Sequence, residues 1–247
     1  MGIGGTILLL VLGLLFGKDF TGGSNGSQPQ VSGGEVGTVE QTPQEARTAE
    51  FVNFLVDDIQ DTVWTQLLPG YQDAKLVMYR DATPTACGMG QSAAGPFYCP
   101  RDQQVYIDLG FYDELRSRFG ASGEFAEAYV LAHEFGHHVQ HLLGTDVELQ
   151  RAYGNGNAAS VQLELQADCY AGVWGHFAAQ HGQLDSPAEM EQGLKAASAI
   201  GDDKIQAQTT GVVRPESFTH GSSAQRTAAL KRGLDSGDPK QCRIGSF

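Results

Sequence analysis

Positively charged residues are scarce in this chain, which argues against nucleic-acid binding. Lysine and arginine number 16 against 29 aspartates and glutamates, which gives a formal net charge of −13 at pH 7. A nucleic-acid-binding protein needs a basic stripe or patch, and this sequence has none. It also lacks a Gly-x-x-x-x-Gly-Lys-Ser/Thr phosphate-binding loop and any internal repeat. With 247 residues, 41% of them hydrophobic, the chain can bury a sizeable core in one domain or two.

Cysteine is also sparse, and its spacing argues against a zinc-ribbon or redox motif. The four cysteines, Cys87, Cys99, Cys169 and Cys242, form no Cys-x-x-Cys pair and allow three pairings. Cys87 and Cys99 bracket a loop rich in glycine and proline, which favours a local bridge between them. Cys169 would then pair with Cys242 and tie the C-terminal tail to a helix. We predict these two disulfides in an oxidising compartment; the alternative is four free thiols in a reducing one.

The N-terminal residues lack two features that accompany a cleaved secretory signal. Residues 3–16 form a continuous run of apolar residues and glycine, with no basic residue before it and no small-x-small cleavage site after it. The run is short for a membrane span, which needs about 20 residues. We interpret residues 1–17 as an N-terminal membrane anchor or an uncleaved signal, residues 18–42 as a Gly/Ser-rich linker, and residues 43–247 as the folded domain.

The chemistry of the chain centres on His133-Glu134-x-x-His137, which lies in an apolar, helix-forming run over residues 122–143. Residues four apart share one face of a helix, so both imidazoles can bind one metal ion. Two neutral imidazoles suit Zn²⁺, and a catalytic zinc site needs a third protein ligand and an open position. Glu134 can take a proton from the water that zinc activates. Because so short a pattern also arises by chance, it needs support from a second cluster.

A second helix, predicted over residues 160–181, supplies that cluster. It carries Glu164 and Asp168, which are four apart among apolar neighbours and so are not a fully solvated pair of acids. Glu164 can be the third zinc ligand, and Asp168 can accept the other ring N–H of a ligand histidine. The metzincin motif is excluded, because Gln140 and Leu143 occupy the places of its glycine and third histidine.

Four other histidines are poorer candidates for ligands. His138 points away from the face that the two motif histidines share, and His141 is better interpreted as polar surface. His176 and His181 lie far along the second helix.

Around these helices the sequence predicts a mainly helical α+β domain with a small β-sheet. A capping box over residues 42–45 starts the first helix, and residues 75–80 and 104–109 are typical of strands. The segments 81–102 and 144–159 are interpreted as loops. The strand at 104–109 is either a sheet edge that aligns an extended peptide or an ordinary strand of the sheet.

A turn before the last helix adds two polar side chains. His220 precedes a capping box at Ser222 and Gln225, and Arg226 lies on the first turn of that helix. A turn residue fixed by a rigid helix start is well placed to face a cleft. We therefore interpret His220 as a donor that stabilises an oxyanion and Arg226 as a further substrate or oxyanion contact. The alternative for His220 is a structural or exposed position. The acidic pair at residues 202–203 is expected to cap a helix or bond backbone amides and is given no catalytic role.

From about Thr42 to Cys242 the chain resembles the bacterial neutral zinc metallopeptidases of the YpfJ-like family. The resemblance rests on motifs spread over the folded domain: Cys87-Gly88, Gly95-Pro-Phe-Tyr-Cys-Pro100, Val105-Tyr-Ile-Asp108, Ala128-Tyr-Val-Leu-Ala-His-Glu-Phe-Gly-His-His-Val-Gln140, Glu164-Leu-Gln-Ala-Asp-Cys169, Gly201-Asp-Asp203 and Phe218-Thr-His-Gly-Ser-Ser223. It implies a gluzincin-like fold with one Zn²⁺ per chain, His133, His137 and Glu164 as ligands, and Glu134 as general base.

The resemblance implies a zinc metallopeptidase, expected to be an endopeptidase, that acts on a peptide or protein. The charge balance argues against nucleic acid as a partner. We expect it to be a single-pass protein of a bacterial membrane, with the catalytic domain on the extracytoplasmic side. The alternative is a non-enzymatic, zinc-stabilised binding domain at the membrane. A cysteine hydrolase that uses Cys169 is a third class, which a disulfide at Cys169 would exclude.

Overall fold

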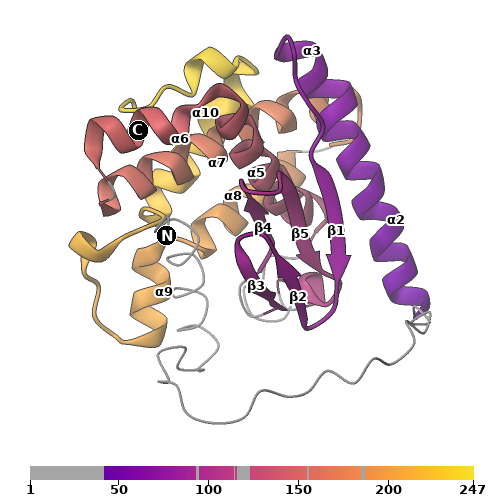
Figure 1. The fold of residues 1–247 in the computed structure, drawn as a ribbon, viewed down its shortest axis with the longest axis horizontal. Helices are drawn as coiled ribbons and strands as arrows, with labels where there is room; N and C mark the ends of the chain where they lie inside the picture. Colours follow the sequence, from indigo (N-terminus) through magenta and orange to yellow (C-terminus); the bar gives the residue numbers. More distant parts are fainter. Residues whose placement is uncertain (1–41, 93–94, 114, 116–122, 155, 185–186) are drawn as a thin grey trace.

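The computed structural model describes residues 42–247 except 93–94, 114, 116–122, 155 and 185–186 (Figure 1). The predicted anchor at residues 1–17, and the predicted linker up to residue 41, lie outside the described residues. Within the described part of the chain, no helix has both the length and the apolar character needed to cross a membrane. The described residues form a mainly helical α+β fold with a small β-sheet, as predicted.

The first described helix, α2 (Pro43–Asp57), begins at the predicted capping box. Thr42 Oγ1 accepts from the Glu45 N–H at 3.2 Å, and the Glu45 carboxylate accepts from the Thr42 N–H at 2.7 Å. The helix continues as a wider π-helical turn, η1 (Asp58–Trp64), and ends in the short α3 (Thr65–Leu67). Its apolar positions pack in the main core, as their spacing predicts. The wider turn was not predicted; its buried polar side chains bond segments distant in sequence.

Two parallel strands, β1 (Lys75–Tyr79) and β5 (Gln104–Asp108), confirm the two predicted strands. A short strand, β4 (Phe97–Cys99), pairs antiparallel with β5, so the sheet order is β1-β5-β4. Because β5 is the central strand, residues 104–109 form an ordinary strand of the sheet and not its edge. One of the two edge strands, β4, contacts α5.

The prediction that residues 81–102 form a loop was wrong. Besides β4, the segment contains a hairpin of β2 (Ala82–Thr85) and β3 (Gly88–Gln91). Its glycine and proline content suggested a loop, but Gly88 begins β3 directly after the turn of the hairpin. Gly88 has a φ of +129°, a conformation that other residues rarely adopt.

Further helices make up the rest of the described chain: α5 (Glu124–Leu143), α6 (Thr145–Tyr153), α7 (Asn157–Gln180), α8 (Pro187–Ala199), α9 (Asp202–Thr209) and α10 (Ser223–Ser236), with the 3-10 turns η3 (Pro215–Ser217) and η4 (Pro239–Gln241). As the predicted run does, α5 ends at Leu143, and its C-cap Gly144 is left-handed with a φ of +70°. The predicted capping box of Ser222 and Gln225 starts α10. The prediction of a loop over residues 144–159 was wrong, because Thr145–Tyr153 form α6. The sequence of this helix is mostly polar, but its Leu149 is buried.

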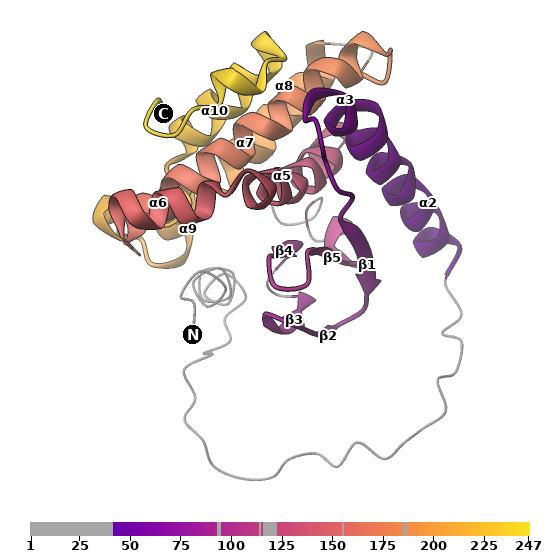
Figure 2. The ribbon, with the colours of Figure 1, turned by 45° about the horizontal axis from the view of Figure 1, so that its top comes forward.

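The sheet and the helices lie in successive layers (Figure 2). α5 packs between β4 and α7, and α10 packs on α7. α2 runs beside β1 in both ribbon views. The main core lies between these layers and contains large buried side chains such as Trp64, Phe125 and Trp174.

Small residues let the helical layers approach to backbone contact. A Cβ added at Gly136 of α5 would lie 2.9 Å from the Ala167 carbonyl oxygen of α7. Where α7 crosses α10, Gly172 of α7 lies against the backbone of α10 and Gly233 of α10 lies against the backbone of α7. A Cβ added to either glycine would collide with backbone atoms of the other helix. α7 is therefore held at close distance by both α5 and α10.

Both predicted disulfides are present. Cys87–Cys99, with an S–S distance of 2.05 Å, joins the β2–β3 hairpin to β4. Cys169–Cys242, with an S–S distance of 2.04 Å, ties the C-terminal segment to α7. All four cysteines are bridged, so the free-thiol alternative is wrong. A bridged Cys169 has no thiolate to act as a nucleophile, which excludes the cysteine hydrolase.

Candidate metal centre

Two histidines of α5 and one glutamate of α7 bring their donor atoms together. His133 Nε2 lies 3.2 Å from Glu164 Oε2, and His137 Nε2 lies 3.5 Å from Glu164 Oε1. Helical spacing puts both histidines on one face of α5, and Gly136 between them lets α5 reach the backbone of α7. These three residues form the group, among those described, that could hold a metal ion, with all donor atoms within 4.8 Å of one another.

This arrangement fits zinc in both donor type and spacing. Zn²⁺ binds imidazole nitrogen and carboxylate oxygen at about 2.0–2.2 Å in a tetrahedral site, which puts neighbouring ligand atoms about 3.3–3.6 Å apart. The separations of 3.2 and 3.5 Å agree with this geometry. In both histidines Nδ1 is hydrogen-bonded elsewhere, so Nε2 is the atom that faces the shared position.

Asp168 holds His133 in this orientation. His133 Nδ1–H donates to Asp168 Oδ1 at 2.8 Å, which is the contact with a ligand histidine that the sequence predicts. Tyr129, one turn earlier on α5, donates its hydroxyl to the same oxygen at 2.6 Å. Burial alone would raise the pKa of Asp168, but the charges and hydrogen bonds of Arg226 and His133 lower this pKa to about 2. An ionised Asp168 holds a proton on Nδ1 of His133 and directs Nε2 towards the position that the candidate ligands share.

The structure does not support Arg226 as a substrate or oxyanion contact. Its side chain is only 3% exposed, and it donates to both oxygens of Asp168, at 2.8 and 2.9 Å. Its Nη2 atom also lies 3.9 Å from Glu164 Oε2. The sequence places Arg226 on the first turn of α10 but does not show that this turn packs against α7. Arg226 therefore supports two carboxylates of the centre from within the protein.

Glu134 is fixed by the edge strand of the sheet. The Tyr98 N–H of β4 donates to Glu134 Oε2 at 2.9 Å. Burial raises the pKa of Glu134, the neighbouring histidines oppose it, and the net shift is upward. A carboxylate whose pKa is raised and that lies beside a metal site is suited to accept a proton.

His220 lies on the turn before α10 and is buried beside Asp202. Its Nδ1 lies 3.2 Å from Asp202 Oδ1 and 3.0 Å from Thr219 Oγ1. The other oxygen of Asp202 accepts the backbone N–H groups of residues 219, 220 and 221. The expectation that the acidic pair bonds backbone amides is confirmed, since Asp203 also accepts the Ser223 N–H. The contact of Asp202 with the His220 ring was not expected.

The His220 turn lies against the part of α7 that carries Glu164. A Cβ added at Gly221 would lie 3.3 Å from side-chain atoms of Val161 and Leu165. Burial raises the pKa of Glu164, but the charges of His137 and His220 and hydrogen bonds from His133 and His137 lower this pKa well below its usual range. The structure therefore brings His220 near the candidate ligands, on an element separate from both ligand helices.

Two of the histidines that the sequence analysis set aside have other partners. His138 is fully buried, donates from Nε2–H to the Gln72 carbonyl at 2.6 Å, and accepts from the Tyr98 hydroxyl at 3.0 Å. His176 donates from Nδ1–H to the Leu234 carbonyl at 2.8 Å. Neither belongs to the group that could hold a metal.

Sequence reasoning missed three residues that support the centre. Gln140 Oε1 accepts from His137 Nδ1–H at 2.8 Å, as Asp168 accepts from His133. Gln140 and Tyr129 lie three and four residues from a motif histidine, so helical spacing could have indicated both. Tyr98 comes from a distant strand, and no pattern in the sequence points to it.

The chain is similar in sequence to one family and to several bacterial proteins. A family model described as "Putative neutral zinc metallopeptidase" matches residues 1–245. The uncharacterized protein YpfJ of Escherichia coli K12 is 48% identical over 252 residues, which cover 98% of this chain and 86% of YpfJ. The uncharacterized proteins Mb2605 of Mycobacterium bovis and Rv2575 of Mycobacterium tuberculosis H37Rv are each 45% identical over 192 residues, 74% of this chain and 66% of the relative. No solved structure matches.

Proposed function

This chain belongs to the family of neutral zinc metallopeptidases, and from that membership we propose that it is a zinc-dependent peptidase that hydrolyses peptide bonds. One observation carries the proposal. The donor atoms of His133, His137 and Glu164 converge from two helices, and Glu134 follows the first of them on the same helix. The substrate class, a peptide or a protein, follows from the family.

His133, His137 and Glu164 would hold one zinc ion per chain. When bound, zinc supplies a Lewis acid that polarises a peptide carbonyl and makes a water molecule more acidic. The side chains of His133 and Glu164 are 7% and 11% exposed, whereas that of His137 is 21% exposed. The site therefore meets solvent most openly at His137, and a substrate would approach from that side.

Glu134 would act as the general base. Its Oε2 accepts the Tyr98 N–H, so Oε1 is the oxygen that would take a proton from the attacking water. Burial raises the pKa of Glu134, which strengthens it as a proton acceptor. The same carboxyl group can then give the proton to the leaving amine.

His220 would stabilise the negative charge that develops on the substrate's carbonyl oxygen. In this role the ring would carry its proton on Nε2, with Nδ1 accepting from the Thr219 hydroxyl at 3.0 Å beside Asp202. A donor fixed in this way needs no rearrangement as the charge develops. Its place next to the α7 turn of Glu164 supports this role.

The experiment compares Glu134→Gln with the wild type and with Glu148→Gln, a matched change on the exposed part of α6. Elemental analysis measures zinc in the purified protein, and a fluorogenic protein substrate measures cleavage. We expect about one zinc in all three proteins, with cleavage lost only in Glu134→Gln. A wild type that binds no zinc would contradict the proposal. A wild type that binds zinc but cleaves no peptide would favour the zinc-stabilised binding domain.

We also propose that the domain works on the extracytoplasmic side of a bacterial membrane, tethered by residues 1–17. The two disulfides support this location, because such bonds persist in oxidising compartments. Alkylation of thiols in intact cells followed by peptide mapping tests it. Four alkylated cysteines in protein from its native compartment would contradict the location.

A further inference from the structure

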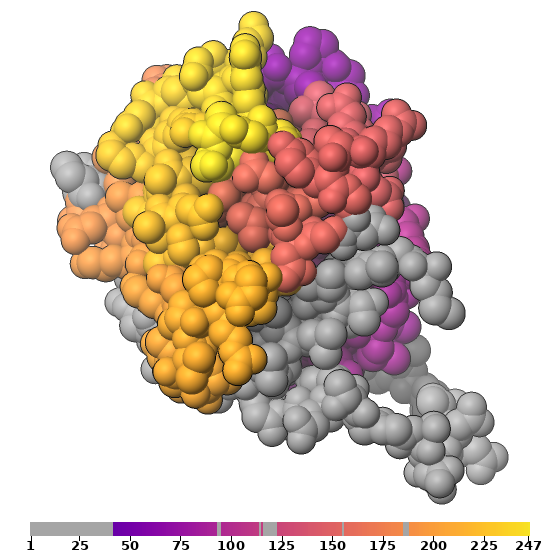
Figure 3. Space-filling view, turned by 90° about the vertical axis from the view of Figure 1, so that its left-hand side faces the viewer, coloured from indigo at the N-terminus to yellow at the C-terminus, as the bar shows by residue number. Residues whose placement is uncertain are grey.

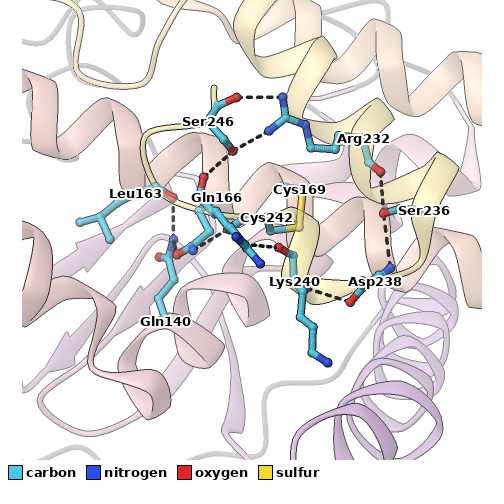
Figure 4. Close-up of a disulfide and its surroundings, with 11 residues drawn as sticks. Gln140, Leu163, Gln166, Cys169, Arg232, Ser236, Asp238, Lys240, Cys242 and Ser246 are labelled. Carbon is cyan, nitrogen blue, oxygen red and sulfur yellow. Dashed lines mark hydrogen bonds between the residues drawn. A yellow bond between two sulfur atoms is a disulfide. The ribbon is translucent and has the colours of Figure 1, made fainter.

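A chain of side-chain amides runs from His137 to the C-terminal segment. His137 Nδ1–H donates to Gln140 Oε1 at 2.8 Å, and Gln140 Nε2 donates to Gln166 Oε1 at 3.0 Å. Gln166 Nε2 then donates to the Cys242 carbonyl at 2.7 Å. Figure 4 shows the two glutamines beside the disulfide of Cys169 and Cys242. Gln140 and Gln166 are only 2% and 5% exposed, so water does not compete for these bonds.

The direction of each bond is fixed by main-chain carbonyls, which can only accept. The Cys242 carbonyl selects the NH2 group of Gln166 and so turns its Oε1 towards Gln140. The Leu163 carbonyl accepts the other amide hydrogen of Gln140 at 2.7 Å. With both hydrogens engaged, Gln140 can offer only Oε1 to His137. The ring must then carry its proton on Nδ1, which leaves Nε2 for a metal.

The Cys242 carbonyl is itself held in place. Cys242 is 2% exposed and is bridged to Cys169, which follows Gln166 by three residues on α7. Beyond the bridge, the Gly245 N–H donates to Gln162 Oε1 at 2.7 Å. Figure 3 shows the C-terminal segment, in yellow, on the surface beside residues of α6. The disulfide is thus a covalent anchor for the acceptor that ends the amide chain.

We propose that Gln140 and Gln166 are positioning residues for His137, and that the Cys169–Cys242 bridge acts on the metal centre through them. This inference rests on the metal-binding part of the proposed function. Its consequence is that zinc affinity depends on a disulfide that supplies no metal ligand.

Loss of the direct acceptor of His137 should cost more than a change farther along the amide chain. Gln140→Ala removes the direct acceptor of His137 and should weaken zinc binding about 10–100-fold. Gln166→Met keeps the side-chain volume but removes the hydrogen bonds of Gln166 to Gln140 and to the Cys242 carbonyl. Because the Leu163 carbonyl still orients Gln140, we expect zinc affinity to fall about tenfold. The Cys169→Ala/Cys242→Ala variant should lose about as much as Gln166→Met.

Zinc affinity is measured on the full chain by competition with a chromophoric chelator, after unfolding curves show that each variant is folded. Gln162→Ala is the matched control, because this glutamine lies on the same helix and bonds the same C-terminal segment outside the amide chain. Removal of the other bridge, in Cys87→Ser/Cys99→Ser, is the second control. Neither control should change zinc affinity by more than about twofold.

A double-mutant cycle separates action through the amide chain from general loosening. If the bridge acts through Gln166, then Gln166→Met should cost little more in the variant that lacks Cys169 and Cys242. Losses that multiply would reveal independent effects and overturn the proposal. A Gln162→Ala loss equal to that of Gln166→Met would overturn it as well.

A readout without metal keeps this inference separate from the proposed function. Nitrogen-15 NMR of neutral His137 in metal-free protein should show the Nδ1–H tautomer in the wild type and a mixture of tautomers in Gln140→Ala. If the wild type binds no zinc but the tautomer shifts, the proposed function fails while the positioning role stands. An unchanged tautomer in Gln140→Ala would overturn the positioning role.

Discussion

Replacing Gly172 with alanine should disturb the metal centre from a distance. Gly172 lies where α7 crosses α10, and an added Cβ would meet Leu234 N at 2.8 Å and Gly233 Cα at 2.9 Å, besides the Leu230 carbonyl. Backbone atoms of a helix cannot turn aside as the tip of a side chain can. Because an ordinary contact begins at 3.4 Å, the contact with Leu234 N alone would require the crossing to open by about 0.6 Å, and the nearer Leu230 carbonyl requires more.

The ion pair of Arg226 and Asp168, which supports the candidate metal centre, also joins α10 to α7. Arg226 of α10 donates to Asp168 of α7 at 2.8 and 2.9 Å, and these bonds would lengthen as the helices part. Overpacking costs about 1–3 kcal/mol, and a contact with backbone belongs at the upper end, while the better helix propensity of alanine returns about 1 kcal/mol. We expect a net loss of about 2 kcal/mol, which lowers the Tm of a domain of this size by about 4–8 °C.

Calorimetry and chelator competition would measure the Tm and the zinc affinity of Gly172→Ala. The control is Gly156→Ala at the start of the same helix, where no atom lies within 4 Å of the added Cβ. The control should lose about 1 kcal/mol or less and keep its zinc affinity. An unchanged Tm together with an unchanged zinc affinity in Gly172→Ala would refute the reasoning.

Three further predictions test the site and the start of the fold. Asp168→Asn should weaken zinc binding about 10–100-fold in chelator competition, because His133 loses its anionic partner; an unchanged affinity would contradict this. His220→Ala should keep its zinc and fold but lower kcat about 10²–10³-fold with less change in KM, and a normal kcat would return His220 to a structural role. The hydrogen bond from Arg80 lowers the pKa of Glu45 from 4.5 to about 2. The ion pair of Glu45 and Arg80 therefore stabilises the fold above the unfolded-state pKa of Glu45, and this stabilisation is lost as pH falls towards 2. Urea unfolding should find Glu45→Gln less stable than the wild type at pH 7, with a difference that shrinks below pH 5; a constant difference would count against the ion pair.

Contacts that follow from local spacing could be predicted from the sequence. His133 and His137 share a face because they are four apart on a helix, and the same rule brings Glu164 and Asp168 to one side of α7. The capping boxes at the starts of α2 and α10 are also patterns within four residues. Such rules place donor atoms near one another without knowledge of the fold.

Contacts between distant segments could not be predicted in this way. Arg226 lies 58 residues from Asp168, and Gln166 lies 76 residues from Cys242, so no local pattern names the partner of either. Arg226 was therefore assigned to the substrate when it is bonded to a buried carboxylate. The strand β4 was missed because it has three residues and lies between glycine- and proline-rich turns.

The geometry of the centre depends on α7 more than on the motif of α5 alone. Residues 163–169 of α7 supply Glu164 to the metal-facing group, Asp168 to His133, and Gln166 to the amide chain that reaches His137. Because one rigid helix carries all three, any shift of α7 relative to α5 moves the candidate ligand Glu164 and the supports of both histidines together. α5 and α10 fix α7 by backbone contact at glycines, and the C-terminal bridge ties it to the chain end. A substitution at these crossings should therefore lower metal affinity even where no candidate ligand is changed.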